Sequence, residues 1–140
     1  MAQMSLELAE KCIRRGRTKA QQLGIQISIA VVNDAGELIA YARMKQRRGG
    51  FNERKTIAKA KTAAAYRKET KEIMEEFADR PGNYFIIGMS AIYPDDFWAG
   101  PGGAPIFVDG EQVGAVGVSG SSPENDHECA VAASKVMQAD

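Results

Sequence analysis

Apolar and polar residues follow a helical period in four segments of the chain. In residues 6–23, apolar side chains recur at steps of three and four, so they share one face of a helix. Ser5 stands where an N-cap is favoured, and Gly24 stands where helices commonly end. Pro123 has the early helical position that proline prefers. The predicted helices cover residues 6–23, 53–67 and 70–79 and a segment that begins at Ser122.

Apolar, β-branched runs between these helices predict two hairpins. Residues 27–33 are followed by a return strand over 37–44, across a turn that contains glycine. Residues 105–108 and 111–119 form a second pair around Asp109-Gly110, a dipeptide typical of tight hairpins. Because hairpin strands are antiparallel, we expect an α+β fold in which helices flank a central antiparallel sheet.

One segment of the chain has no clear period. Residues 83–93 are apolar, and they predict either a short strand or single helical turns. No repeat, linker or low-complexity stretch divides the sequence. We therefore expect residues 1–140 to form a single domain, which their number also favours.

Charge and composition narrow the function. Eighteen basic and 18 acidic residues give a formal net charge of zero, which removes the usual electrostatic basis for nucleic-acid binding. No apolar run approaches the roughly 18 residues that cross a bilayer, and the first eight residues do not resemble a signal peptide. The two cysteines lie inside predicted helices. We expect a cytoplasmic protein with neither a nucleic-acid nor a membrane partner.

Glycine-rich loops flank the second hairpin. Gly102 and Gly103 precede its first strand, and Ser119 and Gly120 follow its last strand and lead into the final helix. Free N–H groups at such a helix start suit a carboxylate or phosphate, and glycine lets a ligand approach the main chain. The pattern fits an anion-binding pocket, and it fits two tight turns with ordinary helix caps equally well.

Lys61 is the strongest single candidate for a functional side chain. The apolar residues of the helix over 53–67 place it in the middle of the buried arc, whereas Lys59 points away. A lysine in that position must reach solvent, pair with an anion or lose its proton. It could bind a ligand carboxylate, act as a base, or form a structural salt bridge with Asp34 or Asp126.

Three further groups have both a functional and a structural interpretation. Arg43 belongs to a basic patch that is either an anion-binding lip or a solvated rim. The aromatic residues around segment 93–98 form either the wall of a planar ligand's pocket or part of the core. Cys12 and His127 are candidates for metal ligands. The structural alternative is a core thiol for Cys12 and an exposed side chain for His127.

Several motifs form one joint pattern along the chain. They are segments 29–36, Arg43-Met44, Ala60-Lys61, 101–105, 114–120 and Pro123–Asp126. Taken together, they resemble the GlcG/HbpS-like family, which includes the C-terminal domain of PduO-type corrinoid adenosyltransferases. The resemblance covers nearly the whole chain.

The resemblance implies a profilin-like layered fold with about five antiparallel strands, a homo-oligomer, and haem or cobalamin as the cofactor of some members. Some relatives use a histidine near the first helix as a metal ligand, and this chain has no histidine there. Segment 93–98 is unusual relative to the family pattern.

These observations support three hypotheses. The first is a small-molecule binding protein for haem, a corrinoid or an anionic metabolite of a catabolic pathway. The second is a small isomerase, tautomerase or lyase that acts on a carboxylate, with Lys61 as base or cation. The third is an oligomeric accessory protein of a larger enzyme. The predicted ligand-binding residues are Arg43, Lys61, Gly102, Gly103, Ser119, Gly120 and Asp126.

Overall fold

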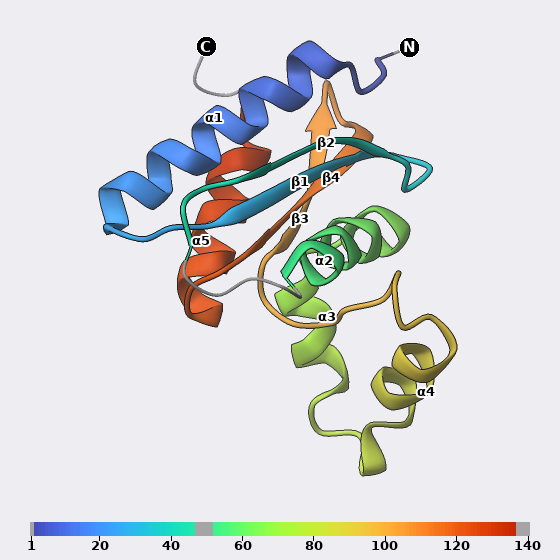
Figure 1. Cartoon of the computed structure of the whole chain (residues 1–140). Coiled ribbons are helices and arrows are strands. Elements are labelled where there is room, and N and C mark those ends of the chain that lie inside the picture. Colours follow the sequence, from blue (N-terminus) through green and yellow to red (C-terminus); the bar gives the residue numbers. More distant parts are fainter. Residues whose placement is uncertain (1, 47–51, 137–140) are drawn as a thin grey trace.

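The structure, a computed structural model, describes residues 2–46 and 52–136 (Figure 1). All four predicted helices and both hairpins are confirmed, and residues 84–92 add a further helix. The helices are α1 (Leu6–Leu23), α2 (Asn52–Tyr66), α3 (Thr70–Phe77), α4 (Tyr84–Ile92) and α5 (Pro123–Ser134), and a 3-10 turn, η1 (Pro81–Asn83), precedes α4. The strands are β1 (Ser28–Asn33), β2 (Leu38–Arg43), β3 (Gly103–Val108) and β4 (Glu111–Ser119).

Local hydrogen bonds begin and end the first and last helices as the sequence predicts. The Ser5 hydroxyl accepts the N–H of Leu8 at 3.1 Å, and Gly24 ends α1 in the left-handed conformation with φ 71°. The Ser122 hydroxyl accepts the N–H of Asn125 at 3.2 Å at the start of α5. No helix within the described ranges is both long and apolar enough to cross a membrane.

The strands form one antiparallel sheet in the order β2-β1-β4-β3, so the two hairpins meet through β1 and β4. The described residues contain four strands rather than the predicted five. Residues 83–93, where a further strand was one of the alternatives, instead form η1 and α4. The α+β class is confirmed, and the profilin-like comparison stays a prediction.

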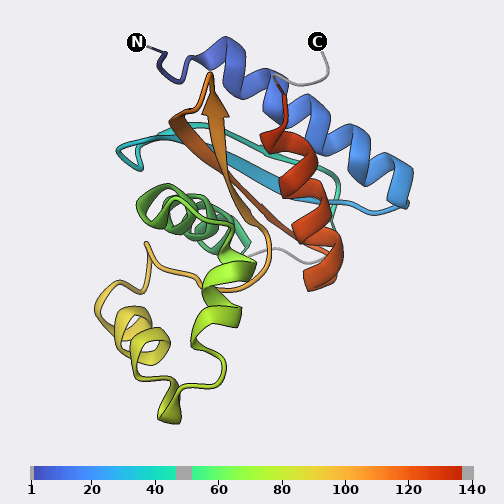
Figure 2. The ribbon, with the colours of Figure 1, turned by 180° about the vertical axis from the view of Figure 1, so that it is seen from behind.

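Helices cover the two faces of the sheet unequally. The helices α1 and α5 pack on one face, against a core of large aliphatic side chains that includes Ile27, Ile29 and Val118. On the other face, α2 packs against small residues such as Ala115 (Figure 1). Figure 2 shows α3 and α4 continuing beyond α2, at the end of the molecule opposite α1. The face with small side chains therefore lets α2 lie close to the strands.

Two paired glycines set how closely α2 approaches. Gly103 and Gly117 are opposite each other in the β3–β4 register. A Cβ on Gly117 would lie 2.7 Å from the backbone nitrogen of Ala60 and still closer to the carbonyl oxygen of Thr56. A Cβ on Gly103 would lie 2.5 Å from the carbonyl oxygen of Lys59. These glycines make room for the helix backbone, one of the two uses that glycine within a strand indicates.

Candidate functional site

The buried lysine of α2 is Lys59, and the prediction that Lys61 has this position is wrong. Lys59 is 3% exposed, whereas the Lys61 side chain is 33% exposed. Alanines at positions 58, 60 and 63–65 extend around much of the helix, so the apolar arc does not define its centre. The helix turns Thr56, Lys59, Ala60 and Ala63 inward, a set at steps of three and four.

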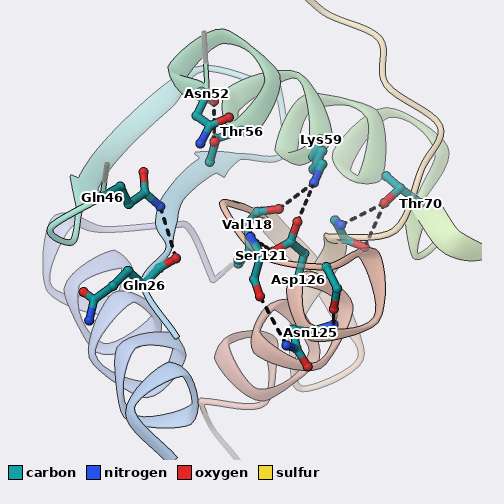
Figure 3. Close-up of polar contacts among 12 residues, drawn as sticks. Gln26, Gln46, Asn52, Thr56, Lys59, Thr70, Val118, Ser121, Asn125 and Asp126 are labelled. Atoms are coloured by element: carbon teal, nitrogen blue, oxygen red, sulfur yellow. Dashed lines mark hydrogen bonds and ion pairs between the residues drawn. The ribbon is translucent and has the colours of Figure 1, made fainter. Parts of the chain in front are cut away.

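Lys59 connects α2 to β4 and α5 (Figure 3). Its Nζ donates to the Val118 carbonyl at 2.8 Å and to Oδ2 of Asp126 at 3.4 Å. The other carboxylate oxygen of Asp126 accepts the N–H of Ser121 at 3.0 Å. A Cβ on Gly102 would lie 2.5 Å from the Val118 carbonyl oxygen and 2.8 Å from Nζ, so glycine leaves room for the two atoms of this hydrogen bond. The predicted anion site at the start of α5 is thus filled by the chain's own carboxylate.

Burial shifts the titration of both partners towards their neutral forms. It lowers the pKa of Lys59 to about 8, and the attraction of Asp126 opposes the shift. Burial likewise raises the pKa of Asp126, which the Lys59 ammonium opposes. Lys59 lines neither the cavity of about 580 Å³ beside Lys61 nor the cavity of about 550 Å³ beside Gly120. We therefore interpret this pair as structural.

The predicted loop residues surround this pair without forming an open pocket. Gly102, Gly103 and Ser119 are buried. The Ser119 hydroxyl has no hydrogen-bond partner among the described residues. Gly120 is exposed and lines a cavity of about 550 Å³ beside Gln46 and Asn52. Gly102 and Gly103 therefore serve the packing of α2, and the role of the glycine loops in ligand binding stays a prediction.

Lys61 lines a different cavity, of about 580 Å³, between the β1–β2 turn, α2 and α4. Its Nζ lies 2.8 Å from Oδ1 of Asp96, in segment 93–98. The proposed role of Lys61 as a base depended on a buried ammonium group. Because its side chain is one-third exposed and paired with Asp96, this condition is not met. This Lys61 cavity is lined by Asp34, Ala35, Gly36, Lys61, Thr62, Ala65, Tyr66, Met89, Tyr93, Asp96 and Phe97.

Aromatic rings form the inner wall of this cavity. Phe97 is buried, and its ring centroid lies 6.0 Å from that of Tyr66 in an edge-on arrangement. Phe85 of α4 contacts both rings, each at 5.8 Å, and stacks on Phe77 at 4.3 Å. Tyr93 also lines the cavity. The aromatic segment thus supplies both packing and the cavity wall, the two interpretations that the sequence left open.

Sequence reasoning missed Thr62, Tyr66 and Met89. The Thr62 hydroxyl accepts the N–H of Trp98 at 2.8 Å, which holds the segment against α2. Its single proton has two acceptors in reach, the Ala58 carbonyl at 2.8 Å and the Asp96 carbonyl at 3.2 Å. Tyr66 lies one helical turn after Thr62, and a correctly oriented α2 would have identified both. Met89 could be identified only once residues 84–92 were known to form a helix.

The remaining candidates lie away from the Lys61 cavity. Arg43 lines a smaller cavity of about 300 Å³ between α1 and β2. Arg47 and Arg48 of the basic patch lie outside the described residues. Tyr84 is exposed, and Trp98 is half-exposed beside Lys55, whose Nζ lies 5.6 Å from the ring centroid.

Neither metal-ligand candidate has the surroundings of a metal site. Cys12 is a core thiol, and burial raises its pKa to about 12, which keeps the thiol protonated. The prediction that His127 is exposed is wrong, since its side chain is only 19% exposed. Its Nε2 lies 3.9 Å from a Glu69 carboxylate oxygen, near the start of α3. Within the part of the chain that the structure describes, no three metal-ligating side chains form a cluster.

The fold and the cavity define an α+β protein with a cleft of mixed aromatic and charged character beside a four-stranded sheet. The chain belongs to the family described as haem degrading protein HbpS-like, whose model matches residues 4–135. The resemblance to the GlcG/HbpS-like family is therefore confirmed.

Curated relatives support this assignment. Protein GlcG of Escherichia coli strain K12 is 34% identical over 122 residues, which are 83% of this chain and 81% of GlcG. An uncharacterized 15.0 kDa protein in the dhaT-dhaS intergenic region of Citrobacter freundii is 30% identical over 128 residues, 90% of this chain and 86% of that protein.

Solved structures share the fold. Klebsiella pneumoniae protein ORFY has a TM-score of 0.87 at 23% identity and covers 100% of this chain and 94% of its own, a likeness of fold alone. The complex of PduOC with haem has a TM-score of 0.82 at 25% identity, covering 96% of this chain and 95% of its own. A double mutant of Streptomyces reticuli HbpS has a TM-score of 0.80 at 27% identity, covering 98% and 88%.

Proposed function

We propose that this chain binds a planar aromatic ligand that carries carboxylates, of the haem class, in the Lys61 cavity. The observation that carries the proposal is the combination of an ammonium group with an aromatic wall in one cleft. The family description and the haem complex of the PduOC neighbour support the choice of a tetrapyrrole. A corrinoid or another anionic metabolite, and membership of a catabolic pathway, stay predictions.

The lining residues match haem in size and in the ring surfaces they offer. A volume of about 580 Å³ lies within the usual range of roughly 300–1,000 Å³ for small-molecule sites. Tyr66, Tyr93 and Phe97 offer ring surfaces to a planar ligand, and Lys61 offers a cation to a propionate. Met89 and the tyrosine hydroxyls are of the chemical types that ligate haem iron. When bound, haem would supply an iron centre that the protein's own side chains lack.

Titration with hemin tests the proposal. We expect wild-type protein to shift the Soret band with saturable stoichiometry, and Lys61→Met to weaken binding about five-fold, since a unit charge about 4 Å away contributes about 1 kcal/mol even in water. Lys68→Met is the matched control, because Lys68 is an exposed lysine paired with Glu76 and is not part of the cavity lining. Its affinity for hemin should equal that of wild type.

Two outcomes would contradict the haem assignment. If neither the Soret band nor the retention of hemin on desalting changes, the cavity does not take haem. If cobalamin is retained and hemin is not, the ligand belongs to the corrinoid class. Equal loss of hemin affinity in Lys61→Met and Lys68→Met would mean that hemin binds outside the Lys61 cavity.

We also infer that the chain forms a homo-oligomer through α4. Tyr84, Ile87 and Ile92 are 81%, 63% and 67% exposed on a helix that is apolar on all sides, and such helices are ordinarily buried. No charged residue occurs from Pro81 to Pro94, so two copies of α4 can pack together without like-charge repulsion.

Light scattering after size-exclusion chromatography tests this interface. We expect Ile87→Glu to reduce the mass of the wild-type oligomer, because it places a charge in the middle of the apolar surface. The control is Leu6→Glu, at an equally exposed apolar residue in the first turn of α1. A monomeric wild type, or the same mass for Ile87→Glu and wild type, would contradict the proposed interface.

A further inference from the structure

The charge of the Lys61 cavity is opposite to what an anionic ligand requires. Its described lining contains two carboxylates, from Asp34 and Asp96, and only one ammonium group, from Lys61. That ammonium is already 2.8 Å from the Asp96 carboxylate. A ligand carboxylate that approaches Lys61 therefore meets a net negative lining and an occupied cation.

Asp96 can release Lys61 without movement of the backbone around it. The Thr62 hydroxyl accepts the N–H of Trp98 at 2.8 Å, which fixes the backbone just after Asp96. The Asp96 carbonyl lies 3.2 Å from the same hydroxyl, as a second acceptor beside the Ala58 carbonyl at 2.8 Å. The preceding residue, Asp95, pairs with Arg54 of α2. The Asp96 side chain itself is 53% exposed and has solvent to enter. Rotation about its side-chain bonds is therefore sufficient to free the ammonium.

We propose that Asp96 is an intramolecular competitor, which occupies on Lys61 the position that a ligand carboxylate takes. The inference rests on the proposed function, in that the Lys61 cavity is the ligand site. It adds that the site selects ligands whose carboxylate displaces Asp96, and that segment 93–98 supplies the residue that sets affinity for anions. The Asp96–Lys61 pair keeps the cation in place while the cavity is empty of anion.

The test compares an anionic with an uncharged aromatic probe. Fluorescence titrations use 1-anilinonaphthalene-8-sulfonate, which carries one negative charge, and N-phenyl-1-naphthylamine, which carries none. We expect Asp96→Asn to lower the dissociation constant of the anionic probe about five-fold, the effect of one charge about 4 Å away in a water-like medium. The constant for the uncharged probe should not change. The gain should decrease as salt is added.

Asp95→Asn is the matched control. It removes the neighbouring carboxylate, which pairs with Arg54 and does not line the cavity, so the affinity for both probes should equal that of wild type. In a Lys61→Met background there is no ammonium to free, so Asp96→Asn should raise affinity for the anionic probe by less than it does when Lys61 is present. That result would place the competition at Lys61. An equal gain in both backgrounds would mean simple repulsion by Asp96 and would overturn the competitor role.

The results separate this inference from the proposed function. Unchanged affinity for the anionic probe in Asp96→Asn, or an equal change for both probes, would overturn the competitor role even if hemin binds. Conversely, the expected difference between the two aspartate variants together with no hemin binding would support Asp96 as a competitor and reject haem as the ligand.

Discussion

Replacing Lys59 by methionine is expected to lower the free energy of unfolding by about 3–5 kcal/mol. The variant leaves the Asp126 carboxylate, which is 4% exposed, without its cationic partner. It also removes the donor to the Val118 carbonyl. A buried charge that loses its partner retains the full cost of leaving water, which makes a single substitution in a buried pair more damaging than loss of the whole pair. Urea unfolding followed by circular dichroism measures the change.

A second substitution tests whether the unpaired Asp126 carboxylate causes the loss of stability. In Lys59→Met/Asp126→Asn the buried charge is gone, and the Asn carbonyl oxygen can still accept the Ser121 N–H that Asp126 binds. We expect the double variant to recover more than half of the stability that the single variant loses. If both variants were equally unstable, the loss would come from packing of the lysine stem and not from the unpaired carboxylate.

Lys61→Met is the control within the same helix. Its partner Asp96 is half-exposed, so loss of that pair should cost less than about 1 kcal/mol. The pH dependence gives a second readout. Between about pH 8 and 10.5 the unfolded chain binds more protons at Lys59 than the folded chain, because the pKa is lowered from 10.5 to about 8. Wild-type stability should therefore rise with pH over this window relative to Lys59→Met. Equal costs for Lys59→Met and Lys61→Met would reject the assignment of Lys59 as the buried lysine.

Gly117→Ala is expected to destabilise the fold by about 3 kcal/mol or more, because its Cβ has no room. The nearest atoms are the backbone of Thr56 and Ala60 in α2, and neither can rotate away as a side chain could. To relieve the contact, α2 must move off the sheet, which also displaces Lys59 from Asp126. Thermal and urea unfolding provide the measurement.

Gly88→Ala is the contrasting substitution. Gly88 lies within α4, and a Cβ there meets nothing within 4 Å. Alanine is favoured over glycine within a helix by about 1 kcal/mol, so this variant should be as stable as wild type or more stable. Comparable losses for both variants would mean that backbone conformation, and not contact with α2, explains the need for glycine at 117.

The hairpins and the capped helices could be predicted because their signals are local. Asp109-Gly110 joins two adjacent runs of strand residues, and Ser5 and Gly24 act on residues three or four positions away. The α4 segment lacked such a signal. It is apolar on every side, so neither a period of two nor one of 3.6 residues is visible, and contact with Phe77 and Tyr66 decides where Phe85 lies.

The candidate site depended on the orientation of α2 about its own axis, which the pattern of apolar residues does not specify. The sequence identified Lys61 and the aromatic segment as candidates, and it named Asp34 or Asp126 as the partner for a buried lysine of the helix. Asp126 is the one that pairs with the buried lysine. The sequence assigned that partner to the wrong lysine. A rotation of α2 by part of a turn exchanges the surroundings of Lys59 and Lys61, and the alanines around the helix make both orientations almost equally apolar.

By itself, the sequence determined the type and order of most elements, the antiparallel pairing of each hairpin, and the family. Those features depend on neighbouring residues and on backbone geometry that short segments already specify. Only the tertiary structure decided the orientation of α2, the helical state of residues 84–92 and the meeting of Lys61 with Asp96. The orientation of α2, and with it the place of Lys61, depends on close contact with Gly103 and Gly117, where two main chains and not side-chain polarity set the geometry. The position of residues 84–92 depends on ring contacts of Phe85 with Tyr66 and Phe77, which lie outside that segment of the sequence.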